Sequence, residues 1–361
     1  MLIPELPSFL TQLGGADYKG LIISLFTVTA MLSRPFSGKL SDKIGRVPVM
    51  MFGAVVCVVC SLFYPLLTTI NTFFLLRLVH GFSTGFTPTG QAAYLSDIIP
   101  SHRRGEAMGY LGTASGLGMA CGPAIGGLVS NQFGLSIVFY LSSFFALLSV
   151  IILWGTHETL KDKKRFSVSM LKIQRKDLFE PLVWEPCLVM GLATYAYGTM
   201  FTLLPDLGVY MGIQNKGLLF TWFTIASLVV RLMGGKVSDR FGRVPVLRVS
   251  VFFIVVAMII IGLAKDQWWV IAGIVLYGFA HGTTSPALLA WATDLSDEHH
   301  KGRGVASLYI FMELGIGMGA FLSGWFYHND STNFFFTFMV SGTLAALAFV
   351  FLAIRPLLAR A

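Results

Sequence analysis

Glu313, His281 and Arg77 are ionisable residues that stand within long apolar stretches, and Glu313 lies far from either end of its stretch. A charged side chain in such surroundings is costly, so each of them marks a candidate functional site. A carboxylate there is either protonated or paired with a partner. We predict that Glu313 carries a proton and that His281 or Arg77 modulates its proton affinity. The alternative is that Glu313 makes a structural hydrogen bond to a neighbouring helix.

Two polar stripes accompany these residues at helical spacing. The downstream stripe consists of Tyr277, His281, Thr284, Leu288 and Trp291, and the upstream stripe of Arg77, His80, Thr84, Thr87, Gln91 and Tyr94. Steps of three and four residues return to the same side of a helix. Two such stripes suit the walls of a water-filled cavity better than contact with lipid. The alternative is that each polar group is simply satisfied in the protein interior.

Two tyrosines extend the set of cavity candidates. Tyr309 precedes Glu313 by one helical turn. Tyr197 lies in an aromatic stretch that could contact an apolar or cationic ligand. Aromatic residues make up 14% of the chain, so most of them are expected to face the core or lipid.

A charged, glycine-punctuated segment occurs twice in the chain. Residues 38–48 (GKLSDKIGRVP) recur as residues 235–245 (GKVSDRFGRVP), 197 residues downstream. The apolar stretches before the two copies align in the same register. Such a repeat indicates a chain built from two similar halves.

Composition predicts a membrane protein. The chain is 55% apolar and 12% charged, against about 25% charged residues in soluble domains. Of its 26 Lys and Arg residues, 20 fall in alternate loops, which is the positive-inside pattern. The net charge of +8 therefore indicates orientation and not binding to nucleic acid. Cys57 and Cys60 form a C-x-x-C pair among valines, where we expect them to be packing residues.

Hydrophobic periodicity and length predict eleven membrane helices. They cover residues 20–40, 49–67, 73–98, 105–129, 135–154, 187–211, 217–235, 246–263, 268–292, 304–326 and 334–354. Residues 156–179 form a basic, partly helical link inside the cell. In a twelve-helix scheme these are helices 2 to 12, because residues 1–10 are too short to span a membrane. We therefore expect that about 20 residues of a first helix are lacking.

The duplicated segment resembles the signature G-x-L-x-D-x-x-G-R between helices 2 and 3 of the major facilitator superfamily. Residues 77–81 (RLVHG) are similar to the R-x-x-x-G element of that family. Residues 118–127 (GMACGPAIGG) are similar to G-x-x-x-G-P-x-x-G-G, an element found mainly in its antiporters, especially drug exporters. In the second half, Ile274 replaces the arginine and Ala320 the proline.

The resemblance implies a conformational role for the duplicated segment. Asp42 is expected to accept hydrogen bonds from the N-terminal amides of another helix, near Gly304, and to hold an outward-facing state. Arg46 is expected to pair with Asp97, and the second copy offers the same pair. The residues in this role are Gly38, Asp42, Gly45, Arg46 and Asp97, and then Gly235, Asp239, Gly242, Arg243 and Asp294. The alternative is that these charges only fix topology.

Glycines crowd residues 112–127, and a spacing of four allows close packing against another helix. The motif residues are Gly118, Gly122, Pro123, Gly126 and Gly127. Proline removes a backbone hydrogen bond and can bend the helix, so this segment is a hinge, a packed seam, or both. Arg34 and Arg231 stand one turn from the membrane interface, where long basic side chains snorkel to water.

Together these features predict an all-α membrane protein of two six-helix bundles with pseudo-twofold symmetry. The N-terminal bundle covers residues 1–155, a cytoplasmic linker 156–182, and the C-terminal bundle 183–361. The resemblance implies a transporter, not an enzyme, that exports drug-like molecules or metabolites in exchange for protons by alternating access. The alternatives are a sugar or metabolite facilitator or importer and a truncated, non-transporting remnant.

The expected partners are a small-molecule substrate, protons as the coupling ion and the lipid bilayer. We expect an integral protein of the cytoplasmic membrane, with the basic loops and the C-terminus in the cytoplasm. No cofactor, metal or nucleic acid is expected, and the protein is expected to be a monomer.

Overall fold

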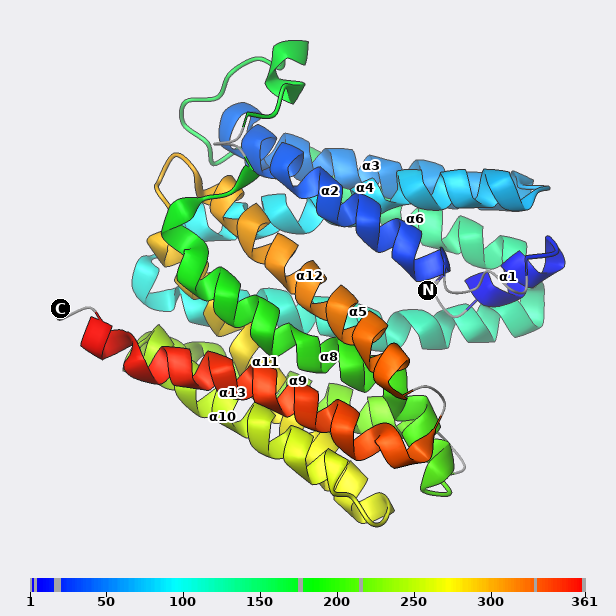
Figure 1. The fold of residues 1–361 in the computed structure, drawn as a ribbon. Helices are drawn as coiled ribbons and strands as arrows, with labels where there is room; N and C mark the ends of the chain where they lie inside the picture. The colour runs from blue at the N-terminus through cyan, green and yellow to red at the C-terminus, as the bar shows by residue number, and fades with distance from the viewer. Residues whose placement is uncertain are drawn as a thin grey trace. The chain divides into compact units, whose positions relative to one another are not determined.

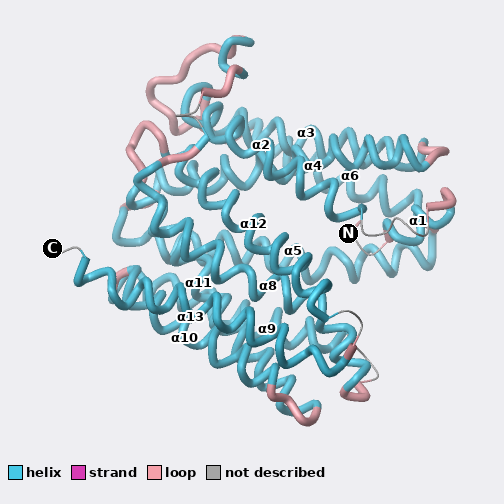
Figure 2. Tube along the Cα trace, in the orientation of Figure 1, coloured by secondary structure: helices cyan, strands magenta, loops and turns pink. Residues whose placement is uncertain are grey.

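Helices make up the regular secondary structure in residues 2, 5–15, 21–174, 178–213, 217–327 and 330–358, the part that the computed structural model describes (Figures 1 and 2). No strand occurs within these ranges. The described residues form eleven long helices: α2 (Leu21–Ile44), α3 (Arg46–Phe63), α4 (Ile70–Ile98), α5 (Arg104–Phe133), α6 (Leu135–Trp154), α8 (Trp184–Tyr210), α9 (Gly217–Phe241), α10 (Arg243–Gly262), α11 (Gln267–Leu295), α12 (Lys301–Tyr327) and α13 (Phe334–Leu358). The short helices include α1 (Leu6–Gln12), η2 (Tyr64–Leu66), η3 (Ser101–Arg103), η4 (Val168–Leu171), η5 (Pro181–Val183) and η6 (Ser331–Asn333).

The helices extend further into the basic segments than the sequence predicts. Helix α6 has the predicted bounds, but α2 continues to Ile44 and α9 to Phe241. The duplicated segment is therefore helical on both sides of a single glycine. Gly45 and Gly242 have φ angles of 125° and 88°, a region that glycine enters without the steric cost that a Cβ imposes.

Six segments of the described part are long and apolar enough to cross a membrane. They are Arg46–Leu66, Leu135–Trp154, Pro181–Leu204, Arg243–Gly262, Lys301–Tyr327 and Ser331–Arg355. Helices α2, α5 and α9 are not among them, and neither are α4 and α11, which are 29 residues long. These two helices carry the predicted polar stripes, and the polar residues lower their mean hydropathy.

Backbone contacts divide the chain into two compact units. The first unit contains Met1–Ile98, Leu117–Pro181 and Ser296–Tyr309, and the second contains Ile99–Gly116, Leu182–Leu295 and Ile310–Ala361. The start of α5 thus belongs to the second unit, and the start of α12 belongs to the first. The predicted division into residues 1–155, 156–182 and 183–361 stays a prediction.

In the first unit, α4 packs against both α2 and α3, and α3 packs against α6. Small residues allow the close approach of α4 to α2. A Cβ at Gly81 would lie 2.5 Å from the carbonyl oxygen of Phe26, and one at Gly85 would lie 2.9 Å from that of Ala30. Apolar residues of α1 complete the core at one end of this unit, where Phe9 packs edge-on against Phe139 at 5.1 Å.

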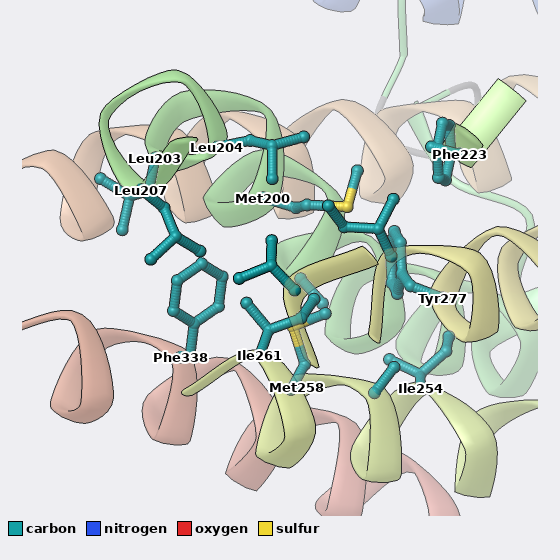
Figure 3. Packing of buried hydrophobic residues seen from close by; sticks show 14 of the residues in the cluster. Met200, Leu203, Leu204, Leu207, Phe223, Ile254, Met258, Ile261, Tyr277 and Phe338 are labelled. Atoms are coloured by element: carbon teal, nitrogen blue, oxygen red, sulfur yellow. The ribbon is translucent and has the colours of Figure 1, made fainter. Parts of the chain in front are cut away.

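The second unit repeats this packing with α11 against α9 and α10, and α10 against α13. Gly278 and Gly282 approach the carbonyl oxygens of Phe223 and Ser227 in the same way. Both glycines stand 197 residues after Gly81 and Gly85. The core between α8, α9, α10, α11 and α13 is apolar, and its labelled members in Figure 3 are Met200, Leu203, Leu204, Leu207, Phe223, Ile254, Met258, Ile261, Tyr277 and Phe338.

Candidate functional site

The first charged cluster lies where α2 meets α3, in the first unit. It consists of Asp42, Arg46, Asp97, Lys301 and the backbone amides of Gly302 and Arg303. The amide of Gly302 donates to Asp42 Oδ1 (2.7 Å), and the amide of Arg303 donates to Asp42 Oδ2 (2.9 Å). These amides belong to the first turn of α12, which has no intrahelical acceptor for them. Asp42 therefore caps α12 and lies at the positive end of its dipole.

Arg46 joins the carboxylates of this cluster. Its Nη1 donates to Asp42 Oδ1 at 2.6 Å, and its Nε donates to Asp97 Oδ2 at 3.1 Å. Lys301 Nζ donates to Asp97 Oδ1 at 2.9 Å. The side chains of Arg46 and Asp42 are only 1% and 5% exposed. Each buried charge thus depends on its partner for compensation.

The link between α6 and α8 covers the first charged cluster. Glu158 accepts hydrogen bonds from the amides of Arg46 and Val47, each at 3.0 Å. The residue before α3 is a glycine, which has no side chain with which to cap the helix, so Glu158 supplies the cap from 112 residues away. Thr159 Oγ1 donates to Asp97 Oδ2 at 2.9 Å. The link is therefore part of the cluster.

The second charged cluster lies in the second unit. It consists of Asp239, Arg243, Asp294, Arg104 and the amides of Gly105 and Glu106. Both amides donate to Asp239 at 2.8 Å, so Asp239 caps α5. Arg243 donates to Asp239 and, through Nε, to Asp294 (2.9 Å). Each member stands 197 residues from its counterpart in the first charged cluster.

The contacts predicted for the duplicated segment are present. Arg46 pairs with Asp97 and Arg243 pairs with Asp294. Asp42 accepts hydrogen bonds from the backbone amides of residues 302 and 303. These residues come just before Gly304, the position near which the contact was predicted.

The glycines of the segment allow this approach. A Cβ at Gly38 would lie 2.8 Å from the Cβ of Ala306, so glycine lets α2 reach α12. The surroundings of Gly235, the second copy's equivalent, lie outside what the structure describes. The conformational role of both copies stays a prediction.

Arg34 is buried, so the expectation that it snorkels to water is wrong. Its side chain reaches α4, where Nη1 donates to Thr89 Oγ1 at 3.0 Å. Its guanidinium carbon also lies 4.4 Å from the ring centroid of Tyr309. A neighbouring helix and an aromatic face replace water as the partners of this cation. Tyr309, predicted as a cavity residue, is thus in contact with Arg34 in the first unit.

Arg77 and His80 lie together in the first unit, joined by a residue that the stripe pattern does not include. Tyr64 accepts a hydrogen bond from Arg77 Nη1 (3.2 Å), and its hydroxyl also lies 3.2 Å from His80 Nδ1. Arg77 Nε donates to the carbonyl of Ile22, and its guanidinium carbon lies 4.6 Å from the ring centroid of Phe26. Arg77 is therefore a buried cation held by neutral acceptors and an aromatic face.

Thr84 and Gln91, with Thr87 between them, line a cavity of about 410 Å³ in the first unit. Its walls come from α3, α4 and α6, and Cys57 and Ser149 contribute to them. Thr84 and Gln91 are thus accessible in this cavity, and their role in binding a substrate stays a prediction. The upstream stripe is divided, because Arg77 and His80 are buried.

The downstream stripe is aromatic at one end and hydrogen-bonded at the other. His281 packs against Tyr197 (ring centroids 4.9 Å apart) and Tyr277 (5.9 Å). The hydroxyl of Tyr277 is buried and has no hydrogen-bond partner among the described residues. Thr284 is buried, and its hydroxyl contacts Ser250 Oγ on α10 at 2.9 Å. Thr284 thus has a structural partner, and its role in a cavity stays a prediction.

Glu313 is buried, with 7% of its surface exposed. It lies in the part of α12 that belongs to the second unit, where α12 packs closely on α8. A Cβ at Gly319 would overlap the carbonyl oxygen of Tyr195, and Thr194 Oγ1 donates to the carbonyl of Met312 at 3.2 Å. Such an environment favours a protonated or paired carboxylate. Its role as proton carrier stays a prediction.

The glycines of α5 do not share one packing face. Gly112 and Gly116 meet α9, where a Cβ would come within 2.7 Å of Leu228 at Gly116 and would overlap Arg231 at Gly112. A Cβ at Gly118 would meet no atom of the described residues within 4 Å. Six residues turn a helix by about 600°, which moves Gly118 well away from the face of Gly112. The role of Gly118 in close packing stays a prediction.

The remaining motif residues of α5 differ in their surroundings. Gly122 is half-buried and Gly126 is buried. A Cβ at Gly127 would lie 3.9 Å from Glu5 Oε1. The side chain of Pro123 lies outside the described residues. The hinge role of this segment stays a prediction.

Comparison with known proteins adds independent information. The sequence model of the Major Facilitator Superfamily matches residues 1–216 and again residues 186–360. The multi-drug resistance efflux pump PmrA of Streptococcus pneumoniae serotype 4 is 28% identical over 340 residues, which cover 88% of this chain and 82% of that protein. The quinolone resistance protein NorA of Staphylococcus aureus is 24% identical over 338 residues, with 90% and 84% covered.

Two solved structures share the fold. The human organic anion transporter MFSD10 gives a TM-score of 0.81 at 20% identity and covers 97% of this chain and 89% of its own. The proton:xylose symporter XylE gives a TM-score of 0.81 at 13% identity, with 97% and 90% covered. At these identities the likeness concerns the fold alone.

Proposed function

Because this chain belongs to the major facilitator superfamily, we propose that it exports small molecules across the cytoplasmic membrane in exchange for protons. The family and the apolar helices make it an integral membrane transporter, and efflux pumps are among its relatives. Proton coupling and alternating access are our inference. The names of the relatives favour drug-like substrates, with quinolones as the first to test.

The observation that carries the proposal is how the two charged clusters are composed. Asp42, in the first sequence half, caps α12 in the second half, and Asp239, in the second half, caps α5 in the first. A transporter that opens to each side in turn must break and remake contacts between its halves. Single carboxylates that cap helix ends are contacts of this kind, since each depends on two hydrogen bonds and a dipole.

We assign the two bundles to residues 1–155 and 183–361, joined by the link 156–182. The repeat of the clusters at a constant offset supports this assignment. The basic loops and the C-terminus then lie in the cytoplasm, following the distribution of Lys and Arg. The charged clusters then lie on the cytoplasmic side.

In the proposed mechanism Glu313 binds the coupling proton, and His281 and Arg77 tune its proton affinity. The residues assigned to the substrate cavity are His80, Thr84, Gln91, Tyr197, Tyr277, Thr284 and Tyr309. The burial of Glu313 supports the first role, because the proton affinity of a buried carboxylate depends on its surroundings. The cavity lined by Thr84 and Gln91 supports the assignment of these two residues to the substrate cavity.

The test is transport by the purified protein in proteoliposomes that contain a pH-sensitive dye. With an imposed pH gradient, we expect a fluorescent quinolone to move against the direction of proton flow, and proton movement to depend on the quinolone. Glu313→Gln should abolish gradient-driven transport while leaving exchange of quinolone down its own gradient. The matched control is Asp206→Asn, which neutralises an exposed acid in α8.

Each other outcome contradicts the proposal in a specific way. Quinolone movement that ignores the pH gradient would make the protein a facilitator. Equal effects of the two variants would remove Glu313 from the mechanism. No transport of any tested small molecule would favour a non-transporting role.

A further inference from the structure

A basic cavity of about 820 Å³ adjoins the first charged cluster within the first unit. Its walls come from the end of α2, from the link between α6 and α8, and from the segment that begins α12. The lining residues are Lys39, Asp42, Lys43, Asp162, Lys164, Phe179, Pro181, His299, His300 and Arg303. The volume lies in the range of about 300–1,000 Å³ that small-ligand sites occupy.

The charges of this cavity favour an anion. Four cationic side chains line it, those of Lys39, Lys43, Lys164 and Arg303, against two carboxylates, those of Asp42 and Asp162. Arg303 is also paired with Glu180, so the three lysines supply the excess positive charge. The charge of Asp42 is already compensated by Arg46 and by two backbone amides. Lys39, which is 7% exposed, places its ammonium group against the link, where Nζ donates to the carbonyl of Lys172 at 2.7 Å. Converging cations in a partly enclosed space produce a strong positive potential.

The walls are held in place by specific contacts. The amide of Lys164 donates to the carbonyl of Lys43 at 2.7 Å, which fixes the link against α2. Glu180, at the far end of the link, is 3% exposed and pairs with Arg303. These contacts keep cationic residues of three separate segments around one space.

The loop before α12 is also ordered by its own hydrogen bonds. Asp297 Oδ1 accepts a hydrogen bond from the amide of His299 at 2.8 Å, which lowers the pKa of Asp297 below its usual value. The ionised Asp297 also lies 3.2 Å from His300 Nδ1. This loop therefore presents His299 and His300 to the cavity in a defined conformation.

We propose that this cavity binds a phosphate-bearing anion, and that the bound anion stabilises the contact between Asp42 and the start of α12. Lysine ammonium groups and an arginine guanidinium are the side chains that bind phosphate oxygens most strongly. The source of the phosphate is either the headgroup of an anionic lipid or a soluble phosphate compound. Lys43 and Lys164 supply the two cationic contacts that a substitution can remove without touching the first charged cluster.

Binding at this place couples to conformation. The walls come from α2 and from the α12 start, so separating these two segments would dismantle the site. A ligand that binds one conformation better shifts the equilibrium toward it. The anion thus favours the conformation in which the first charged cluster is formed. This consequence rests on the proposed alternating access, whereas the binding itself does not.

The second half of the chain supplies a matched comparison. Lys236 and Arg240 stand 197 residues after Lys39 and Lys43. Both are exposed, and Lys236 pairs with Glu106 at 3.3 Å. Replacing Lys236 and Arg240 therefore removes the same number of charges from an exposed surface.

The experiment has a soluble arm and a lipid arm, each with the full-length protein. In the soluble arm, the protein in phosphatidylcholine nanodiscs is titrated with inorganic pyrophosphate, and the thermal unfolding midpoint is followed. In the lipid arm, the midpoint is compared between vesicles of phosphatidylcholine and vesicles containing phosphatidylglycerol. We expect the midpoint to rise in at least one arm, and the rising arm identifies the source of the phosphate.

Two double variants test the location. Lys43→Gln/Lys164→Gln should weaken the stabilising ligand by about tenfold or more, since two charge-assisted contacts are lost. Lys236→Gln/Arg240→Gln should leave the affinity unchanged. Circular dichroism without ligand confirms that both variants are folded. Absence of stabilisation in both arms, or an equal loss in the two double variants, would overturn the proposal. Neither readout requires transport, so failure of the proposed function would leave this result intact.

Discussion

The two charged clusters have the same hydrogen-bond geometry and different surroundings. The side chains of Arg46 and Asp97 in the first are 1% and 15% exposed, whereas those of Arg243 and Asp294 in the second are 11% and 26% exposed. Duplication has therefore preserved the positions of the charges and not their access to water. A less hydrated ion pair loses more when one partner is removed, because the remaining charge stays buried.

The link residues account for this difference. Glu158 caps α3 and Thr159 contacts Asp97, so both cover the first charged cluster. The residue 197 positions after Glu158 is Arg355, which pairs with Glu185 at 2.6 Å instead of contacting the second cluster. One segment of the chain thus gives the first cluster contacts that its duplicate does not share, and this predicts a graded response to mutation.

The largest expected difference follows from removing the capping carboxylate of each cluster. Asp42→Ala leaves Arg46 buried and the first amides of α12 uncapped, so we expect the free energy of unfolding to fall by about 3 kcal/mol. Asp239→Ala should cost about 1 kcal/mol, because water can reach Arg243. Reversible unfolding of the purified protein in mixed micelles with increasing denaturing detergent measures both. Equal losses would show that the difference in exposure has no energetic consequence.

Weakening the hydrogen bonds that the link makes to the first charged cluster should reduce the difference in stabilisation energy between the two clusters. Glu158→Gln keeps the side-chain shape but weakens two hydrogen bonds to the α3 amides, so we expect a loss of about 1 kcal/mol. Its matched control is Arg355→Gln at the corresponding position of the second half. The informative measurement uses the double variant. Asp42→Ala should lower the free energy of unfolding by less when Glu158→Gln is already present, because the effects of mutations within one hydrogen-bond network are not additive. Strict additivity would separate the link from the first charged cluster.

These contacts also show where sequence reasoning succeeds and where it stops. The pairs of Arg46 with Asp97 and of Arg243 with Asp294 could be predicted, because the same charged residues occur at the same spacing in both copies of the repeat. The bounds of α6 followed from apolar length alone. The cap by Glu158 could not be predicted, since the contact is not local and a loop residue carries no periodic signal.

The contacts of the polar residues inside the helices were likewise predicted in part. Periodicity placed Arg77 and His80 on one face of α4, and they do lie together. Tyr64 was missed because it follows α3 in a short 3₁₀ helix, outside any stripe. The burial of Arg34 was not predicted, because its distance from the helix end does not show which residues the neighbouring helix offers. Here α4 offers the hydroxyl of Thr89 as a hydrogen-bond acceptor. The sequence thus predicts faces better than it predicts partners.

A smaller difference is expected from the arginines one turn inside the clusters. Arg34 stacks on Tyr309, whereas the residue 197 positions before Tyr309 is Gly112, which lies beside Arg231, the counterpart of Arg34. Tyr309→Leu should lower the free energy of unfolding by about 1 kcal/mol through loss of the cation–π contact. Tyr309→Phe keeps the ring and serves as the control. If Phe and Leu cost the same, the tyrosine hydroxyl or simple packing is what matters at this position.

The smallest effect should appear when salt is varied with no mutation at the clusters themselves. Raising the ionic strength from about 0.1 to 1 M shortens the screening length from about 10 to 3 Å, which weakens exposed pairs more than buried ones. The second charged cluster should therefore lose stabilisation first. At high salt the cost of Asp239→Ala should fall to about that of the lost α5 cap alone, whereas the cost of Asp42→Ala should remain within a few tenths of its low-salt value in kcal/mol. The same unfolding assay at two salt concentrations tests this. Parallel losses at both positions would mean that water and ions reach the first charged cluster as freely as the second, and that the link does not shield it.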